Sequence, residues 1–201
     1  MAKGKKSAAF TLDADGADYL AQIVTFIRKA RSSTRPDIAS STSLSRTLAT
    51  KFIDMACEMN LIQSGELGQS TGGRAPRLLN FNESAGSILV AELGATGFQV
   101  AASDLSGNLT DISYVDADVS NGPEYVLSLV EKSFDSLIIK YKINNLWGIG
   151  IGVPGPVEFA NGIPVSPPIM PGWDRYPIRD RFANNYKVPV WIDNDVNLMA
   201  L

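Results

Sequence analysis

The spacing of the apolar residues changes near residue 85, and this change limits what the chain can fold into more than any other feature does. Before it, apolar residues recur at the spacing of one helix face, as at Leu20, Ile23 and Ile27. From Gly86 on, they gather in short runs separated by turn residues, which is typical of strands. The sequence therefore predicts three parts: a disordered polar arm over residues 1–16, a mainly helical domain over 17–82 and an α/β domain over 83–201.

Three helices are expected in the helical domain. The first covers Ala17–Ala30. A second, short helix begins after Thr34, because Asp37 three positions later completes a capping pattern that satisfies the free amides of a helix start. Ser45 caps a third helix. Its predicted inward side consists of Leu48, Phe52, Met55 and Met59.

The outward side of the third helix predicts DNA binding. Three helices whose second and third members are joined by a few small polar residues are typical of a helix-turn-helix, in which the third helix enters the major groove. Two short apolar segments then bracket Gly65–Arg77, which contains four glycines and two arginines and is expected to form a β-wing. The predicted DNA-binding residues are Ser45, Arg46, Thr47, Thr50 and Lys51 on the helix, and Arg74 and Arg77 in the wing. A purely structural three-helix bundle is the alternative.

The charge distribution agrees with a polyanionic partner for the first part only. Residues 1–80 contain 11 Lys and Arg against 7 Asp and Glu, whereas residues 81–201 contain 7 against 14. A basic segment attracts nucleic acid and an acidic one repels it. By residue type, Arg46 is suited to a guanine edge and Lys51 to a phosphate.

The order of elements in the second part predicts its fold class. Three strands joined by turns come first, at Ser87–Leu93, Phe98–Asp104 and Leu109–Val115. They are followed by a helix, a strand, a second helix and a last strand, over Glu124–Tyr141, Leu146–Val153, Ile178–Tyr186 and Val188–Ile192. This is the order of the first lobe of an actin-like (ribonuclease-H-like) ATPase fold. Because such a lobe normally faces a second one, the end at Leu201 predicts that the domain is incomplete.

Four stretches, in this order and behind a helix-turn-helix, resemble the ROK family of repressors, open reading frames and kinases, and within it the transcription regulators that carry an N-terminal winged helix. They are Ser70–Arg77, Glu92–Thr96, Gly148–Pro156 and Asp193–Asn197. The resemblance implies a sugar-responsive repressor of carbohydrate-metabolism genes, similar to xylose and N-acetylglucosamine repressors. Its expected partners are a double-stranded operator, a sugar or sugar-derivative effector and further copies of the chain, as a homodimer or homotetramer.

One of these stretches corresponds to the phosphate loop of the family's kinases. There an Asp-x-Gly-x-Thr turn brings backbone amides to nucleotide phosphates, and the aspartate organises magnesium. Here Glu92 stands at the aspartate position, followed by Gly94 and Thr96. The alternative is a tight turn between two strands. ATP and magnesium are expected only if the chain is an ATP-dependent sugar kinase, which is the rival function.

The resemblance also implies a sugar site. In the family, the pair matching Asn194 and Asp195 binds sugar hydroxyls, and the aspartate is the catalytic base in the active kinases. Gly155, Pro156 and Ser166 match the segment that lines the same pocket. The alternative for Asp193 and Asn194 is a helix N-cap.

Other classes of site and location are not expected. The chain has no histidine and one cysteine, so the family's zinc site is expected only beyond residue 201. No apolar run approaches the roughly 18 residues that span a bilayer. The basic start lacks the apolar core of a secretory signal, and a cytoplasmic protein without membrane partners is expected.

Overall fold

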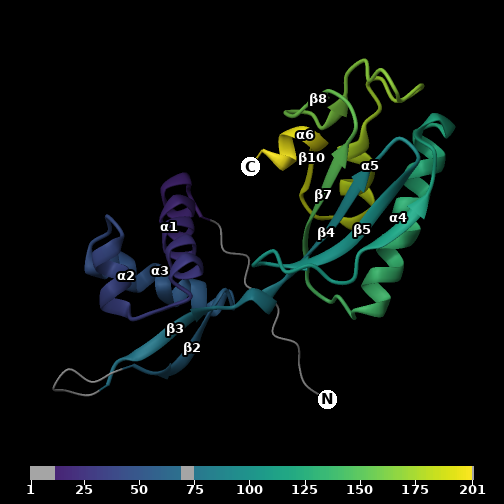
Figure 1. Cartoon of the computed structure of the whole chain (residues 1–201). Helices are drawn as coiled ribbons and strands as arrows, with labels where there is room; N and C mark the ends of the chain where they lie inside the picture. Colours follow the sequence, from purple (N-terminus) through teal and green to yellow (C-terminus); the bar gives the residue numbers. More distant parts are fainter. Residues whose placement is uncertain (1–11, 69–74, 201) are drawn as a thin grey trace. The chain divides into compact units, whose positions relative to one another are not determined.

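The computed structural model describes residues 12–68 and 75–200, and these form two compact units (Figure 1). The first unit ends at Ala85 and the second begins at Gly86. Among the described residues, no helix combines the length and the apolar character that crossing a membrane requires.

Each of the three helices of the first unit begins at a side-chain cap. They are α1 (Ala14–Ala30), α2 (Arg35–Ser41) and α3 (Arg46–Glu58). The helix α1 begins three residues before the predicted Ala17, inside the expected arm, because the Asp13 side chain accepts a hydrogen bond from the Gly16 amide. The predicted caps of the other two are confirmed: Thr34 and Asp37 form a reciprocal capping box, and Ser45 caps α3.

A small antiparallel sheet completes the first unit. Its strands are β1 (Ser32–Ser33), β2 (Ile62–Leu67) and β3 (Arg77–Phe81), in the order β1-β3-β2. The pairing of β2 with β3 confirms the two apolar segments expected to flank a hairpin. Residues 69–74, where the predicted Arg74 lies, are outside the described residues.

The buried side of α3 differs from the predicted one. Only Phe52 of the four predicted residues is buried, and Leu48, Met55 and Met59 are half-buried. The residues that pack inward with Phe52 are Ala49, Ile53 and Ala56. Small alanine side chains allow neighbouring helices to approach closely, so the helix is turned relative to the prediction, which was based on the largest side chains.

The second unit is built on a five-stranded mixed sheet with the order β10-β7-β4-β5-β6. Its strands are β4 (Ser87–Leu93), β5 (Gly97–Asp104), β6 (Ser113–Asp116), β7 (Leu146–Val153) and β10 (Val190–Asn194). The three strands β4, β7 and β10 are parallel, and β5 and β6 are antiparallel to their neighbours.

Two strand predictions need correction. The expected strand over Leu109–Val115 is β6, which begins only at Ser113, because the preceding residues cross back and bond to Ala102 through Thr110. The last strand begins and ends two residues later than expected, at Val190 and Asn194. Its pairing with β7 over Ile149–Val153 fixes these bounds.

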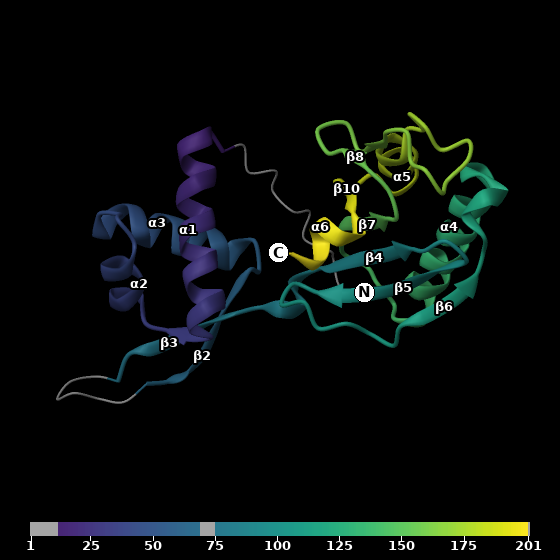
Figure 2. The ribbon, with the colours of Figure 1, turned by 45° about the horizontal axis from the view of Figure 1, so that its top comes forward.

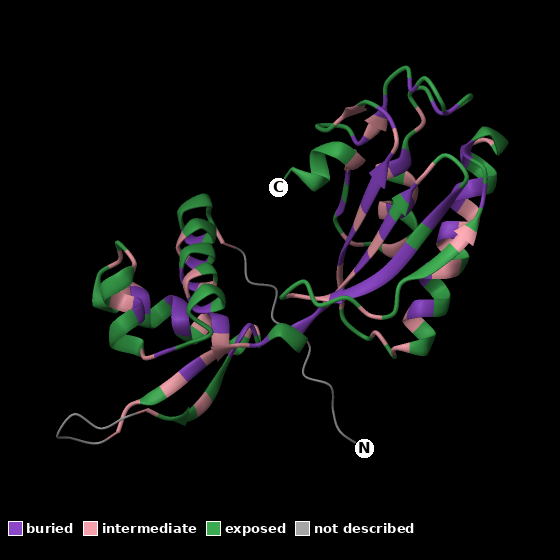
Figure 3. Cartoon of the chain, in the orientation of Figure 1, coloured by how far each residue is buried: buried purple, intermediate pink, exposed green. Residues whose placement is uncertain are grey.

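Two helices cover one face of the sheet. They are α4 (Pro123–Lys140) and α5 (Ile178–Tyr186), and Figure 2 shows both on the same side. The core between these helices and the sheet is formed by alternating strand residues such as Leu89 and Ile151, together with Phe134 of α4 and Phe182 of α5, all of them almost completely buried. Figure 3 shows long stretches of these strands in the colour of buried residues. The alternation is the expected signature of strands that are buried on one face.

The opposite face of the sheet is marked by small residues in β7. Glycines occupy alternate positions there, at Gly148, Gly150 and Gly152. A Cβ at Gly148 would lie 2.8 Å from the Trp191 ring, and one at Gly152 would lie 3.1 Å from Leu198. Leu198 belongs to α6 (Asp195–Met199), so the glycines admit the side chains that cross this face.

The long connection between β7 and α5 contains its own hairpin, which the sequence did not predict. Strands β8 (Val157–Glu158) and β9 (Ile163–Pro164) pair antiparallel. Two short 3-10 helices, η1 (Glu83–Ala85) and η2 (Val119–Asn121), precede β4 and α4.

Candidate functional site

The outward side of α3 is a continuous polar surface. All five side chains predicted there are exposed, namely Ser45, Arg46, Thr47, Thr50 and Lys51. The Ser45 hydroxyl oxygen accepts a hydrogen bond from the Leu48 amide at 3.3 Å, so this residue also fixes the start of the helix. Arg77, at the start of β3, is exposed as well.

An ion pair that sequence reasoning missed lies beside this surface. Arg35 of α2 donates to the Asp54 carboxylate of α3 at 2.6 Å, and both side chains are about half exposed, at 44% and 54%. The contact compensates the negative charge of Asp54, which follows Lys51 by three residues and would otherwise weaken the positive potential of this surface. The two residues are 19 positions apart, so no local sequence pattern predicts this ion pair.

The second candidate site lies at one edge of the five-stranded sheet. Because β4, β7 and β10 are parallel, their carboxyl ends reach the same edge. The register places Glu92 beside Gly152 and Gly152 beside Asp193. The strand order therefore brings together stretches that lie about 100 residues apart in the sequence.

A cavity of about 400 Å³ extends from this edge over the sheet face opposite α4 and α5 and brings together two of the predicted site residues, Glu92 and Asp195. Glu92 is exposed and Asp195 is half-buried. The other lining residues come from β4, β5, the β5–β6 connection, β7 and α6: Val90, Ala91, Gln99, Val100, Ala101, Leu109, Ile112, Gly152, Leu198 and Met199. The cavity thus combines two carboxylates and an amide with an apolar wall, a combination that suits a small ligand carrying a few polar groups. Its lining does not include Gly155, Pro156, Ser166 or Asn194.

The Asn194 side chain is occupied at both ends by the protein itself. Its Oδ1 accepts hydrogen bonds from the amides of Val196 and Asn197, which makes it the N-cap of α6. Its Nδ2 donates to the Gly155 carbonyl at 3.0 Å. The helix-cap alternative therefore holds for Asn194, and the same side chain ties the end of β10 to the loop after β7.

The loop after β7 folds back on itself, so that the segment around Ser166 packs against the segment around Gly155. A Cβ at Gly155 would lie 2.8 Å from the Cβ of Pro167, so glycine is needed there for the close approach of the protein's own chain. The Val165 amide donates to the Pro156 carbonyl at 2.9 Å. Ser166 is exposed and has a φ of 45°, in the left-handed region.

The turn after β4 is bonded to neighbouring parts of the same unit. The Gly94 amide donates to the Gly97 carbonyl at 2.7 Å, and the Thr96 carbonyl accepts from the Ala117 amide at 3.1 Å. These bonds describe a tight turn between β4 and β5. The Gly94 amide is consequently not available to a phosphate in this conformation.

The family model named ROK matches residues 88–201, more than half of the chain. The chain belongs to the ROK family. Curated relatives include the xylose repressor of Caldicellulosiruptor bescii, 32% identical over 173 residues that cover 79% of this chain and 43% of the relative. The xylose repressor of Bacillus subtilis is 26% identical over 168 residues, with 83% and 43% covered. This ROK chain thus spans less than half the length of these relatives.

Solved structures support the same assignment of the fold. A ROK family transcriptional regulator, a homologue of the E. coli MLC protein, gives a TM-score of 0.74 at 20% identity over 91% of this chain and 46% of that one. A ROK family glucokinase from Streptomyces griseus gives 0.50 at 19% identity over 57% of this chain and 35% of that one. The fold is therefore the mixed α/β fold that ROK regulators share with ROK sugar kinases.

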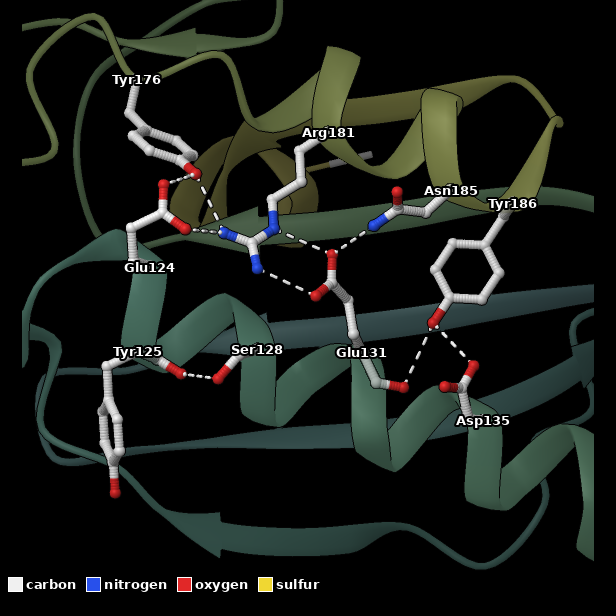
Figure 4. Close-up of polar contacts among 9 residues, drawn as sticks. All are labelled: Glu124, Tyr125, Ser128, Glu131, Asp135, Tyr176, Arg181, Asn185 and Tyr186. Carbon is white, nitrogen blue, oxygen red and sulfur yellow. Dashed lines mark hydrogen bonds and ion pairs between the residues drawn. The ribbon is translucent and has the colours of Figure 1, made fainter.

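In this ROK chain, an ion-pair network fastens α5 and the preceding loop to α4 (Figure 4). Arg181 of α5 forms two hydrogen bonds with the Glu131 carboxylate, at 2.8 and 2.9 Å, and a third with Glu124 at 2.8 Å. The Arg181 and Glu131 side chains are only 17% and 18% exposed. The hydrogen bonds that Arg181 donates to Glu131 raise the pKa of Arg181, so its charge is fixed.

The loop joins this network through Tyr176. Its hydroxyl donates to Glu124 at 2.6 Å and accepts from Arg181 at 2.9 Å. The hydrogen bond from Tyr176 lowers the pKa of Glu124, and burial raises the pKa of Tyr176 itself. No local pattern in the sequence predicts this network, because Tyr176 and Arg181 lie about 50 residues from Glu124 and Glu131.

Within residues 12–68 and 75–200, no three His, Cys, Asp or Glu side chains are grouped so that they could hold a metal ion.

Proposed function

We propose that this chain is part of a sugar-responsive transcription regulator that represses genes of carbohydrate metabolism. In this proposal the first unit is a winged helix-turn-helix. The helices α2 and α3 are its helix-turn-helix, α3 reads the major groove, and the β2–β3 hairpin is the wing. The second unit responds to a sugar or a sugar derivative.

The observation that carries the proposal is the exposed polar side of α3. Arg46, Thr47 and Lys51 project from a helix whose other side is buried, so they can enter a groove without disturbing the core. Because a structural three-helix bundle also has a polar outer side, the β2–β3 hairpin that follows α3 is the second feature that favours a winged helix-turn-helix. The names of the relatives from C. bescii and B. subtilis, both xylose repressors, support the same function.

The effector is proposed to bind at the sheet edge described above. Asp195 and Glu92 offer hydrogen-bond acceptors to sugar hydroxyls, and the apolar wall can contact the carbon face of the sugar. The segment containing Gly155, Pro156 and Ser166 forms the adjoining side. Because Asn194 is a helix cap that also holds Gly155, we assign it an indirect role.

Catalysis is the less supported function for this site. In the family's kinases an aspartate organises magnesium, and here the position is occupied by Glu92, whose longer side chain displaces the oxygen. Phosphoryl transfer tolerates such displacement badly. A coupled assay of ATP turnover with common hexoses and pentoses should therefore detect no turnover near one per second.

The partners follow from the same proposal. A helix-turn-helix regulator binds paired half-sites as a dimer, so we propose a homodimer or homotetramer on a double-stranded operator in the cytoplasm. The effector would act by shifting the equilibrium between arrangements of the two DNA-binding heads.

The direct test is operator binding by the full-length protein with and without D-xylose, D-glucose or N-acetylglucosamine. One of these sugars should change the operator affinity, and Asp195→Ala should abolish the change while leaving sugar-free affinity nearly the same. The matched control is Asp116→Ala, at an exposed position at the end of β6. An intact sugar response in Asp195→Ala would show that Asp195 has only a structural role.

A further inference from the structure

The loop between β7 and α5 carries Ser166 in a conformation that needs support. Its φ of 45° lies in the left-handed region, which costs free energy for any residue with a side chain. The Ser166 amide donates to the Asp174 carboxylate at 2.7 Å. This charge-assisted hydrogen bond is a strong local contact that favours the unusual conformation.

The same contact fixes a loop that adjoins the candidate sugar site, because the Gly155 carbonyl on which this loop packs accepts a hydrogen bond from Asn194, the neighbour of the cavity residue Asp195. Immediately before Ser166, the Val165 amide donates to the Pro156 carbonyl, and immediately after it, Pro167 is buried against Gly155. These two segments form a wall that adjoins the cavity without lining it, and this wall keeps its shape only while residues 165–167 keep their path.

Asp174 is itself held in place from both sides. The preceding Trp173 is fully buried, and its indole nitrogen donates to the Val119 carbonyl at 2.8 Å. The following Arg175 amide donates to the Pro164 carbonyl at 2.9 Å. Two residues after Asp174, Tyr176 is held by hydrogen bonds with Glu124 and Arg181 (Figure 4). The exposed carboxylate is thus presented to Ser166 from a rigid support.

We propose that Asp174 is a positioning residue for the effector site: it holds Ser166 and Pro167 against Gly155 and so preorganises one wall of the site before the sugar arrives. The inference rests on the proposed function of this site as a sugar-binding site. Asp174 acts through Ser166 and not by contact with the sugar. Preorganisation raises affinity because the loop need not be ordered at the moment of binding.

The test compares three variants of the full-length protein by calorimetric titration with D-xylose, D-glucose and N-acetylglucosamine. Asp174→Ala should raise the Kd of the bound sugar at least about tenfold, because the wall must then be ordered on binding. Asp174→Asn, whose side-chain oxygen still accepts the Ser166 amide, should stay within about threefold of the wild type. Asp180→Ala, at an exposed position in the first turn of α5, is the matched control and should bind as the wild type does.

Two further measurements separate positioning from general destabilisation. In the sugar-free protein, hydrogen exchange at the Ser166 amide should be faster in Asp174→Ala, while exchange in β7 and the thermal midpoint stay unchanged.

The outcomes are distinct. If the wild type binds a sugar and Asp174→Ala binds it equally well, or if exchange at the Ser166 amide is unchanged in Asp174→Ala, the positioning role is wrong although the site is a sugar site. If the wild type binds none of the three sugars, the proposed function is overturned and this inference with it.

Discussion

In the first unit, Arg46, Thr47 and Lys51 project from α3 into solvent, whereas in the second unit Asn194 is bonded to the protein through both its oxygen and its nitrogen. One ion pair from each unit shows a similar contrast. Arg35 and Asp54 are about half exposed, and Arg181 and Glu131 are mostly buried. On the proposed function, Arg46, Thr47 and Lys51 of the first unit would touch a partner without holding the fold, whereas in the second unit Asn194, which holds the fold, lies next to Asp195 of the proposed sugar site.

The largest expected effect is on the buried ion pair. Arg181→Ala leaves the Glu131 carboxylate mostly buried without its partner and should lower the free energy of unfolding of the second unit by about 2–4 kcal/mol. Arg35→Ala removes an exposed partner and should cost the first unit less than about 1 kcal/mol.

Tryptophan fluorescence during urea unfolding distinguishes the units, because Trp147, Trp173 and Trp191 all belong to the second one. Helical circular dichroism follows α1, α2 and α3 as well. Equal losses of unfolding free energy for Arg181→Ala and Arg35→Ala would show that the two ion pairs do not differ in their contribution to stability. In the Glu131→Gln background, Arg181→Ala should cost clearly less, which would assign the effect to the pair.

The next effect concerns DNA, and it should leave stability untouched. Arg46→Ala should weaken operator binding by about 1–3 kcal/mol and relax the preference at one base pair, because an arginine in the first turn of α3 can pair with a guanine edge. Lys51→Ala should instead weaken binding to all sequences alike and reduce the salt slope by about one, as expected for a phosphate contact.

An operator and a scrambled duplex titrated at two salt concentrations separate these two signatures. Equal losses on both duplexes for Arg46→Ala would show that α3 does not read bases. Unchanged thermal midpoints in both variants would support the view that Arg46 and Lys51 contribute to DNA binding and not to the stability of the first unit.

Local signals explain which parts of the fold could be predicted from the sequence. Thr34, Asp37 and Ser45 determine the starts of α2 and α3 through contacts within three residues. Short apolar runs bounded by turn residues predicted β4 and β7 with the bounds that the structure has. The buried side of α3 was mispredicted because Ala49 and Ala56 pack inward although they carry little apolar area of their own.

Contacts between distant residues explain the rest. The strand β1 has two residues and exists only through its pairing with β3. It is too short for an alternating apolar pattern to predict it. At the candidate sugar site, the sequence assigned Glu92 and Asp195 to two separate motifs, and the parallel pairing of β4, β7 and β10 is what brings both into one cavity. The supporting contacts of Ser166 with Asp174 depend on the path of a long loop, which residue types alone do not specify.

A smaller effect is expected from the double use of Asn194. Asn194→Ala removes the cap of α6 and the bond to Gly155, and should lower the stability of the second unit by about 0.5–2 kcal/mol. Asn194→Ser keeps a capping oxygen and should recover most of this loss. Calorimetric titration with the effector sugar should show weaker binding by both variants, since neither can donate to the Gly155 carbonyl as asparagine does. If Asn194→Ser binds the sugar with full affinity, the only role of Asn194 is to cap α6.

The smallest effect is a pH dependence at Glu124, on the exposed end of the same network. Because the Tyr176 hydroxyl and then Arg181 hold its pKa below the ordinary 4.5, its ionised form favours the folded state. The stabilisation is fully present above pH 4.5 and is lost as the pH falls below that value through the depressed pKa of the folded state. Glu124→Gln should therefore lower the thermal midpoint slightly at pH 7 and not at all at the acid end of a titration from pH 7 to pH 3. In the Tyr176→Phe background, where the strongest cause of the shift is missing, the same substitution should change the profile less. Parallel profiles for the wild type and Glu124→Gln over this range would show that the exposed end of the network is as loosely coupled to folding as the Arg35 pair of the first unit.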